Sequence, residues 1–512
     1  MFTYSLGQTQ KNHFPNYQAL SRNVHFFQVF VMKDFPVQLL SETSHAGARA
    51  LRFPKLDVPA VDFAQKFPAN QLAESTPRLP ELAEIDVVRH FVNLSSKNYN
   101  VDANFYPLGS CTMKYNPKCC DKWSTMEGFC DLHPYQPEST VQGVLELLYK
   151  VQQWTAEIAG LPNVSLQAAA GAHGEFNSLE VAAKYFREHD PDRKEVVTPD
   201  AAHGTNPASA AMAGFKLVVC KSSPEGLVDL DDLQSKLSDK TAVFMITNPN
   251  TLGLFDPNIS KIAKMVHDAG ALVYVDGANM NAIMGVARPG DFGADMMHFN
   301  THKTFASPHG GGGPGAGPIA VADFLKDYLP HPRVIKTDDG YKLDFGNEHS
   351  IGKVRMFFGS VGVLVRMYGY IRVLGADGIR KTAQRAVLAA NYLAARVKDF
   401  LPIPHPEHPM HEFVASAESL KKEKGISAME IAKGLLDFGI HAPTIYFPMI
   451  VHESLMFEPT ETEPLAMLDY TVESLKKIVE MDSEYLHHAP HTTAISRPDE
   501  VTAAKKPVLK SE

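Results

Sequence analysis

Cysteine is scarce in this sequence, with five residues among 512. A sparse, odd number of thiols argues against a disulfide-stabilised secreted protein and favours reduced cysteines in the cytoplasm. Four of them lie close together in the sequence: Cys111, Cys119, Cys120 and Cys130. They form no CxxC pair and match no common zinc-site spacing, so we expect no bound metal.

Long hydrophobic runs are also missing. The most apolar early stretch, residues 24–32, contains His25 and Gln28 and is too short to span a bilayer. No small-residue cleavage site follows it, which argues against a secretion signal. We therefore expect no membrane association, and we expect residues 1–36 to be an appended segment of uncertain order.

Dense basic clusters are absent as well. The chain has 49 Lys and Arg against 58 Asp and Glu, a formal net charge of −9. This balance argues against a nucleic-acid partner. The remaining composition, with 44% hydrophobic and 21% charged residues, is that of a globular protein of about two or three domains.

Alternating strand and helix patterns occupy the middle of the chain. Residues 37–139 form an N-terminal arm rich in proline and charge, and helical periodicity begins near residue 140. Seven short apolar runs follow, several of them separated by amphipathic stretches: 164–170, 195–199, 216–220, 241–247, 271–276, 296–302 and 318–322. This order predicts an α/β domain over 140–330 with a mostly parallel sheet covered on both faces.

The rest of the chain predicts a smaller unit. Helical patterns cover 352–374 and 377–400, and a second α/β segment continues from there. We therefore expect a C-terminal α/β domain over 331–488 and an extended tail over 489–512.

Several polar residues fall where the predicted strands end. Asp276 closes one apolar run, and Lys303 follows another 27 residues later. Such a pair suits pyridoxal phosphate (PLP), because the lysine amine forms a Schiff base with the aldehyde while the carboxylate pairs with the pyridinium nitrogen. Taken singly, Lys303 would be an exposed lysine and Asp276 a residue that caps a turn.

Other strand-end residues fit the same cofactor. Ala170, Gly171 and Ala172 leave a strand and enter a helix, whose N-terminus could hold the phosphate. His203 could stack on the ring, or could simply precede a helix that Asn-Pro begins. His302 could contact the phosphate or tune Lys303, or its ring could be satisfied by backbone groups.

A glycine run follows the lysine. Residues 310–315 read Gly-Gly-Gly-Gly-Pro-Gly, and no Gly-Lys-Ser/Thr follows them, which excludes a P-loop. Four consecutive glycines cost backbone entropy, so we expect a functional reason such as close approach to a ligand or a gate.

Taken together, the motifs resemble the P-protein family of the glycine cleavage system, glycine dehydrogenase (decarboxylating), and more narrowly subunit 2 of its two-chain bacterial form. The resemblance covers about residues 40–512 and is carried by these segments: Tyr106–Lys114, Ala170–Glu175, His203–Ala208, Asn248–Gly253, Asp276–Asn281, His302–Phe305 with the glycines after it, and Glu458–Glu463.

The resemblance implies the fold of type I PLP enzymes, with Lys303 as the Schiff-base lysine and Asp276 as the partner of the pyridine nitrogen. It implies that His203 stacks on the ring and that the Ala170 loop holds the phosphate. It also implies decarboxylation of glycine, transfer of the aminomethyl group to the lipoyl arm of H-protein, and assembly with subunit 1, most simply as an α2β2 heterotetramer.

The sequence does not identify the group that binds the carboxylate of glycine. The candidates for substrate or channel contacts are Tyr106, Ser110, Thr112, Asn248 and Gly311. Two alternatives stay open: a different type I PLP enzyme, such as an amino-acid decarboxylase or a cysteine desulfurase, and a non-catalytic scaffold subunit.

Overall fold

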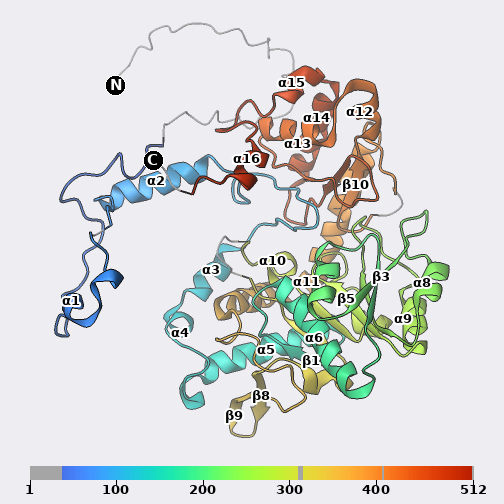
Figure 1. Cartoon of the computed structure of the whole chain (residues 1–512). Coiled ribbons are helices and arrows are strands. Elements are labelled where there is room, and N and C mark those ends of the chain that lie inside the picture. Colours follow the sequence, from blue (N-terminus) through green and yellow to red (C-terminus); the bar gives the residue numbers. More distant parts are fainter. Residues whose placement is uncertain (1–36, 76, 310–314, 406–408, 510–512) are drawn as a thin grey trace.

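The protein is described by a computed structural model in which residues 37–75, 77–309, 315–405 and 409–509 are placed (Figure 1). The predicted appended segment 1–36 and Gly311 lie outside these described residues. Among the described residues, no helix is both long and apolar enough to cross a bilayer.

A seven-stranded sheet forms the centre of the molecule. Its strand order is β1-β7-β6-β5-β4-β2-β3, and the five strands from β6 to β3 run parallel, whereas β7 is antiparallel to both of its neighbours. The mostly parallel sheet predicted from the sequence is therefore confirmed. The strands are β1 Asn163–Ser165, β2 Glu195–Pro199, β3 Lys216–Cys220, β4 Thr241–Thr247, β5 Leu272–Gly277, β6 Met296–Phe299 and β7 Ile319–Val321.

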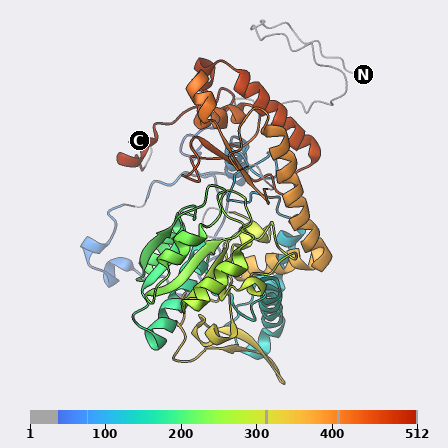
Figure 2. The same cartoon turned by 90° about the vertical axis from the view of Figure 1, so that its right-hand side faces the viewer.

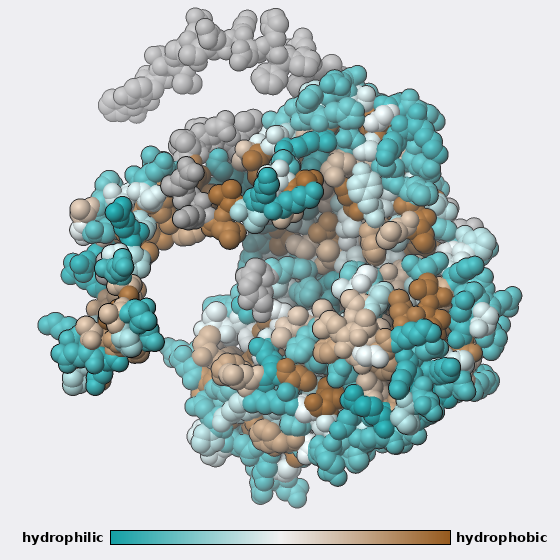
Figure 3. All heavy atoms as spheres, viewed as in Figure 1, coloured by the Kyte–Doolittle hydropathy of each residue, from teal (hydrophilic) through white to brown (hydrophobic). Residues whose placement is uncertain are grey.

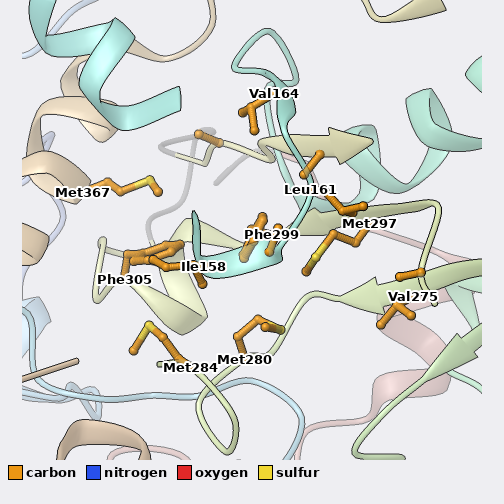
Figure 4. Packing of buried hydrophobic residues seen from close by; sticks show 14 of the residues in the cluster. Ile158, Leu161, Val164, Val275, Met280, Met284, Met297, Phe299, Phe305 and Met367 are labelled. Carbon is orange, nitrogen blue, oxygen red and sulfur yellow. The ribbon is translucent and has the colours of Figure 1, made fainter. Parts of the chain in front are cut away.

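Alternate residues of each strand pack against different helix layers. Val273 and Val275 of β5 belong to one core, together with residues of α5, α9 and α11, as Figure 4 shows in part. Leu272 and Tyr274 belong to the opposite core, which they share with residues of α6. This two-residue period places helices on both faces of the sheet. The helices of this part are α5 Gln142–Ala159, α6 Gly171–His189, α7 Thr205–Met212, α8 Leu230–Lys236, α9 Ile259–Asp268 and α10 Thr301–Thr304.

The longest helix joins this sheet to a second unit. Helix α11, Val361–Val397, bends at Gly375, where φ is 62°. Its first half packs in the core of α5, and its second half contributes Leu393 and Val397 to a separate C-terminal core. In Figure 2 this long helix runs along one side of the molecule from the sheet domain to the C-terminal unit. Buried residues between 334 and 383 also belong to the core of α5, and the predicted division of the chain at 331 stays a prediction.

The C-terminal unit is built on a three-stranded antiparallel sheet of order β10-β12-β11. Its strands are β10 Phe413–Ser416, β11 Thr444–Ile445 and β12 Ser454–Phe457, and its helices are α12 Glu418–Lys424, α13 Ala428–Asp437, α14 Leu465–Glu480 and α15 Ser483–His487. A hairpin of β8 Arg333–Thr337 and β9 Gly340–Asp344 precedes α11.

The first part of the N-terminal arm, residues 37–96, stands away from the rest of the chain (Figures 1 and 3). Its helices, α1 Phe63–Lys66 and α2 Glu84–Ser96, contain no buried residue. The chain meets the body from Tyr99 onward: the Tyr99 hydroxyl donates to the carbonyl of Leu436, and Phe105 forms a β-bridge with Ile440. The helices α3 Lys118–Ser124 and α4 Glu127–Cys130 follow. At the other end, α16 Glu500–Lys505 is also exposed along its whole length.

The short helical segments complete the chain: η1 Ala69–Gln71, η2 Glu138–Thr140, η3 Pro289–Phe292 and η4 Asp323–Tyr328.

Candidate active site

A cavity lies beyond the carboxyl ends of β4, β5 and β6, where open α/β sheets bind their ligands. Loops that follow these strands supply one wall. The loop at residue 110 and the approach to β10 supply the other wall. The lining residues are Ser110, Ala172, Glu175, His203, Thr205, Thr247, Pro249, Asn250, Thr251, Asp276, Ala278, Asn279, His298, Asn300, Lys303, His411 and Glu412.

Lys303 lies on the single turn of α10, directly after β6. The predicted strand 296–302 therefore ends earlier, at Phe299. Thr301 fixes this turn because its hydroxyl donates to the carbonyl of Ala316 at 3.2 Å. Among the described residues, none accepts a hydrogen bond from Lys303 Nζ, so the amine is available to a ligand in the cavity.

Asp276 is buried at the end of β5 and lines the same cavity. Its carboxylate accepts hydrogen bonds from Asn206 Nδ2 and from the backbone N–H of Ala278, both at 3.0 Å. Burial raises the pKa of Asp276, but His298 and these two donors outweigh burial, and the net shift is downward. The carboxylate is thus held as an anion that can pair with a cation.

Behind Asp276, a buried histidine connects two strands. His298 Nε2 lies 3.7 Å from Asp276 Oδ1, and its Nδ1 lies 2.5 Å from the hydroxyl of Tyr274. Burial lowers the pKa of His298, which makes the ring neutral at neutral pH. The hydrogen bonds from Asn206 and Ala278 are therefore the firmer cause of the anionic state of Asp276.

A second carboxylate lies beside the first. Asn206 donates to Glu175 Oε2 at 3.2 Å as well as to Asp276, and the Thr205 hydroxyl donates to the same Glu175 oxygen at 2.9 Å. Burial, followed by the charge of Asp276, raises the pKa of Glu175 to about 7. Two carboxylates that share one amide cannot both ionise freely, so their protonation is linked.

The N-terminus of α6 opens into the cavity, as predicted for the Ala170 loop. Ala170 has extended backbone angles before the helix begins at Gly171, and no side chain caps the first turn. Ala172 lines the cavity. A Cβ at Gly171 would lie 1.6 Å from Asn300 Oδ1, so only glycine fits there. Uncapped N–H groups and the positive end of a 19-residue helix suit a phosphate.

The two predicted histidines lie in different surroundings. His203 lines the cavity, and its Nδ1 lies 2.9 Å from the hydroxyl of Thr205. His302 is not among the residues that line the cavity; its ring packs edge-on against His309 at 4.6 Å. Burial lowers the pKa of His302 to about 3, so this ring carries no charge at neutral pH.

Only some of the residues predicted to contact the substrate or its channel line the cavity. Ser110 lines the cavity, whereas Tyr106, Thr112 and Asn248 are absent from its described lining. Tyr106 stacks on His441 at 3.6 Å. Asn248 Oδ1 accepts a hydrogen bond from the backbone of Asp256 at 2.9 Å. The hydroxyl of Thr112 donates to Glu458 at 2.5 Å.

A buried lysine below the cavity had no role in the sequence-based prediction. Lys114 is 1% exposed, and its ammonium donates to Asn281 Oδ1 at 2.8 Å, to the carbonyl of Thr304 at 3.1 Å and to Glu461 Oε1 at 3.0 Å. It ties together the loop around residue 110, the end of α10 and the segment after β12. Its place in the motif Tyr106–Lys114 is the signal that could have indicated it.

Comparison with known proteins defines the class first. Residues 171–312 match the family model "Aminotransferase class-V". The fold is similar to that of a solved glycine decarboxylase (P-protein) of the glycine cleavage system, with a TM-score of 0.69, 22% identity, and coverage of 80% of this chain and 93% of that one. A Burkholderia pseudomallei sphingosine-1-phosphate lyase matches at a TM-score of 0.60 and 15% identity, over 83% of this chain and 95% of that one. The chain has the PLP-dependent class-V aminotransferase fold.

The particular family follows from close relatives. The chain is 60% identical over 483 residues to "Probable glycine dehydrogenase (decarboxylating) subunit 2" of Rhodopirellula baltica, covering 92% of this chain and 97% of the relative. The Thermotoga maritima protein with the same description is 50% identical over 473 residues, covering 92% and 98%. Residues 382–493 match the family model "Glycine dehydrogenase, C-terminal domain". The chain belongs to the family of glycine dehydrogenase (decarboxylating) subunit 2.

Proposed function

We propose that this chain is the catalytic subunit of a glycine dehydrogenase (decarboxylating), EC 1.4.4.2: it decarboxylates glycine with PLP bound at Lys303 and passes the aminomethyl group to the lipoyl arm of H-protein. The observation that carries the proposal is the shared cavity of Lys303, whose amine has no acceptor among the described residues, and Asp276, a buried anion at a neighbouring strand end.

The residues present fit the cofactor. Lys303 would supply the amine that binds the aldehyde, and the carboxylate of Asp276 would favour the protonated form of the ring nitrogen. The N–H groups at the start of α6 would bind the phosphate, and His203 would cover one face of the ring. When bound, PLP supplies an electron sink for the electron pair that remains when CO2 leaves.

A partner subunit is the second part of the proposal. The arm exposes large apolar side chains with nothing packed over them among the described residues: Leu51 is 69% exposed, Phe53 85%, Leu56 75% and Phe63 63% (Figure 3). Exposed apolar surface of this kind marks an interaction site. Subunit 1 is the partner that the family name implies, and we propose an α2β2 heterotetramer in which this arm forms part of the interface.

The thiols support a proposal for the location of the enzyme. All five cysteines are free, which suits the cytoplasm, and we propose that the enzyme works there.

The experiment that tests the proposal is reduction of the purified protein with borohydride, followed by peptide mapping. A pyridoxyl group on the peptide containing Lys303 is the expected result, and its absence there would contradict the assignment. Lys303→Ala serves as the matched negative control.

Exchange of labelled CO2 into glycine in the presence of lipoylated H-protein then separates the alternatives. A scaffold subunit would show neither modification nor exchange. Another type I PLP enzyme would show the modification without the exchange.

A further inference from the structure

The described lining of the cavity contains no arginine, and Lys303 is its only lysine. Enzymes commonly hold a substrate carboxylate with a bidentate arginine. If Lys303 binds the cofactor, the carboxylate of glycine must be bound by other donors. Two polar residues of the wall opposite Lys303 have no assigned role and are candidates for binding this carboxylate: His411 and Glu412.

Both of these residues are deeply buried. His411 is 2% exposed, and among the described residues neither of its ring nitrogens has a hydrogen-bond partner. Its Nε2 lies 3.7 Å from Glu412 Oε1, beyond hydrogen-bond distance. A buried N–H without an acceptor costs about 1–3 kcal/mol, so a group that accepts from His411 would relieve that cost.

Glu412 is fixed in place by the loop across from it. Its Oε2 accepts the backbone N–H of Ser110 at 2.7 Å, which leaves Oε1 for the cavity. Burial, followed by the charge of Glu458, raises the pKa of Glu412 well above its usual value. Burial also lowers the pKa of His411. These directions favour the neutral form of both side chains, and a neutral carboxyl group and a neutral imidazole can each donate one hydrogen bond.

We propose that His411 and Glu412 form the subsite that binds the carboxylate of glycine, both as hydrogen-bond donors. This assignment rests on the proposed function. It also suits the reaction: the carboxylate loses its charge as CO2 forms, so a strong cationic anchor would stabilise the bound substrate more than the transition state. Neutral donors orient the carboxylate without that disadvantage.

The same residues could instead bind a cation, since ligand atoms of His411, Glu412 and Glu458 lie within 4.8 Å of one another. The hydrogen bonds argue against this use. Glu458 Oε1 already accepts from Thr112 and Asn279, and its Oε2 accepts from the backbone of Thr112. These donors occupy three of the roughly four lone-pair sites of the carboxylate, which leaves it poorly placed to bind a metal.

The test compares two amines that differ in the carboxylate. Glycine and methylamine are titrated against the holoenzyme while the absorbance of the bound cofactor is recorded. In His411→Phe the Kd of glycine should rise about 10- to 100-fold, the effect of losing one hydrogen bond to a charged group. The Kd of methylamine should change by less than about threefold, because methylamine makes no carboxylate contact.

An equal change for both amines, or no change for either, would overturn the subsite. If neither amine alters the absorbance of the unmodified enzyme, the proposed function fails instead. Methylamine binding by His411→Phe also shows that this variant is folded and carries its cofactor.

Glu412→Gln tests whether Glu412 acts as a neutral donor or as an anion, because glutamine has nearly the same shape as glutamate. An amide donates as a protonated carboxyl group does, so the Kd of glycine should stay within about threefold of the unmodified value. If Glu412 were an anion, removing its repulsion would tighten glycine binding, and the proposal would be wrong. A stoichiometric divalent metal in the purified holoenzyme, lost in Glu412→Gln, would also overturn it.

Discussion

The two walls of the cavity are built in different ways. His203 follows β2, Asp276 lies at the end of β5, and Lys303 follows β6. All three strands belong to the parallel part of one sheet, so its topology brings these residues to the same edge. The opposite wall joins segments that lie far apart in the sequence: Ser110 contacts Glu412 across 302 positions, and Lys114 contacts Glu461 across 347. The first wall depends on backbone pairing and the second on pairs of buried polar side chains. We therefore expect substitutions in the first wall mainly to affect chemistry, and substitutions in the second mainly to affect stability.

The largest expected effect is on stability, and it comes from a substitution among the buried polar pairs of the second wall. Lys114→Met removes the cation from a buried pair and leaves Glu461 with only a long hydrogen bond, 3.4 Å, from the Tyr370 hydroxyl; its Oε2 already lacks a partner among the described residues. The free energy of unfolding should fall by about 3–5 kcal/mol. Urea unfolding of the holoenzyme, followed by circular dichroism, measures this change.

Lys118→Met is the matched control. Lys118 also pairs with a carboxylate, Asp102, at 2.6 Å, but the two side chains are 57% and 50% exposed. The loss should be below about 1 kcal/mol. Equal losses at positions 114 and 118 would show that burial does not distinguish the two pairs. Adding Glu461→Gln to Lys114→Met should recover part of the lost stability, because no unpaired charge then remains.

The next largest effect is on the rate of the reaction, and it comes from a substitution in the first wall. Asp276→Asn keeps the shape of the side chain but removes the charge that would face the cofactor nitrogen. Glycine-dependent CO2 exchange should fall by about 100- to 1000-fold. The Tm should change less than it does in Lys114→Met, because strand pairing holds this wall in place.

Asp256→Asn is the control for that experiment. Asp256 is a buried aspartate that accepts the backbone N–H groups of Val228 and Asn258 and does not line the cavity. This substitution should lower stability without a comparable loss of rate. A similar rate loss in both variants would mean that Asp276 has no special role in the chemistry.

The same contrast explains what the sequence could predict about the fold. Strands β2, β3 and β4 have the predicted limits, since short runs rich in β-branched residues, bounded by turn residues, mark strands. The break between the two predicted helices falls at Gly375, where the backbone adopts a positive φ. The run at 296–302 was predicted too long as a strand, because its apolar pattern continues into the helical turn that carries Lys303.

The site was predictable where local pattern determines it. Asp276 and Lys303 stand out because a polar residue ends an apolar run. His298 and His411 were missed: a single buried histidine beside a strand has no distinctive local pattern. Glu175 and Glu458 lie in motifs noted in the sequence, yet their partners come from other segments, so no spacing along the chain could assign their contacts.

The smallest expected effect in this series concerns pH. It tests whether ionisation of the carboxyl groups in the first wall changes the free energy of unfolding. The pKa of Glu175 is raised to about 7 from an ordinary value of 4.5. Between these pH values the unfolded chain has lost a proton that the folded chain keeps. The contribution of Glu175 to stability should therefore be greatest below pH 4.5 and fall as pH rises toward 7, by up to about 3 kcal/mol. Urea unfolding of the cofactor-free protein at several pH values measures the slope.

Glu175→Gln should remove this fall, because an amide cannot ionise. Glu188→Gln is the control on the same helix: its hydrogen bond to His349 lowers the pKa of Glu188, so this group contributes with the opposite sign, gaining stability as pH rises. The fall between pH 4.5 and 7 should persist in Glu188→Gln. If it also persists in Glu175→Gln, the linked carboxylates of the first wall are not its cause. If the fall disappears only in Glu175→Gln, ionised carboxylates in the first wall lower the stability at neutral pH. A cation beside Asp276 would then reduce this loss.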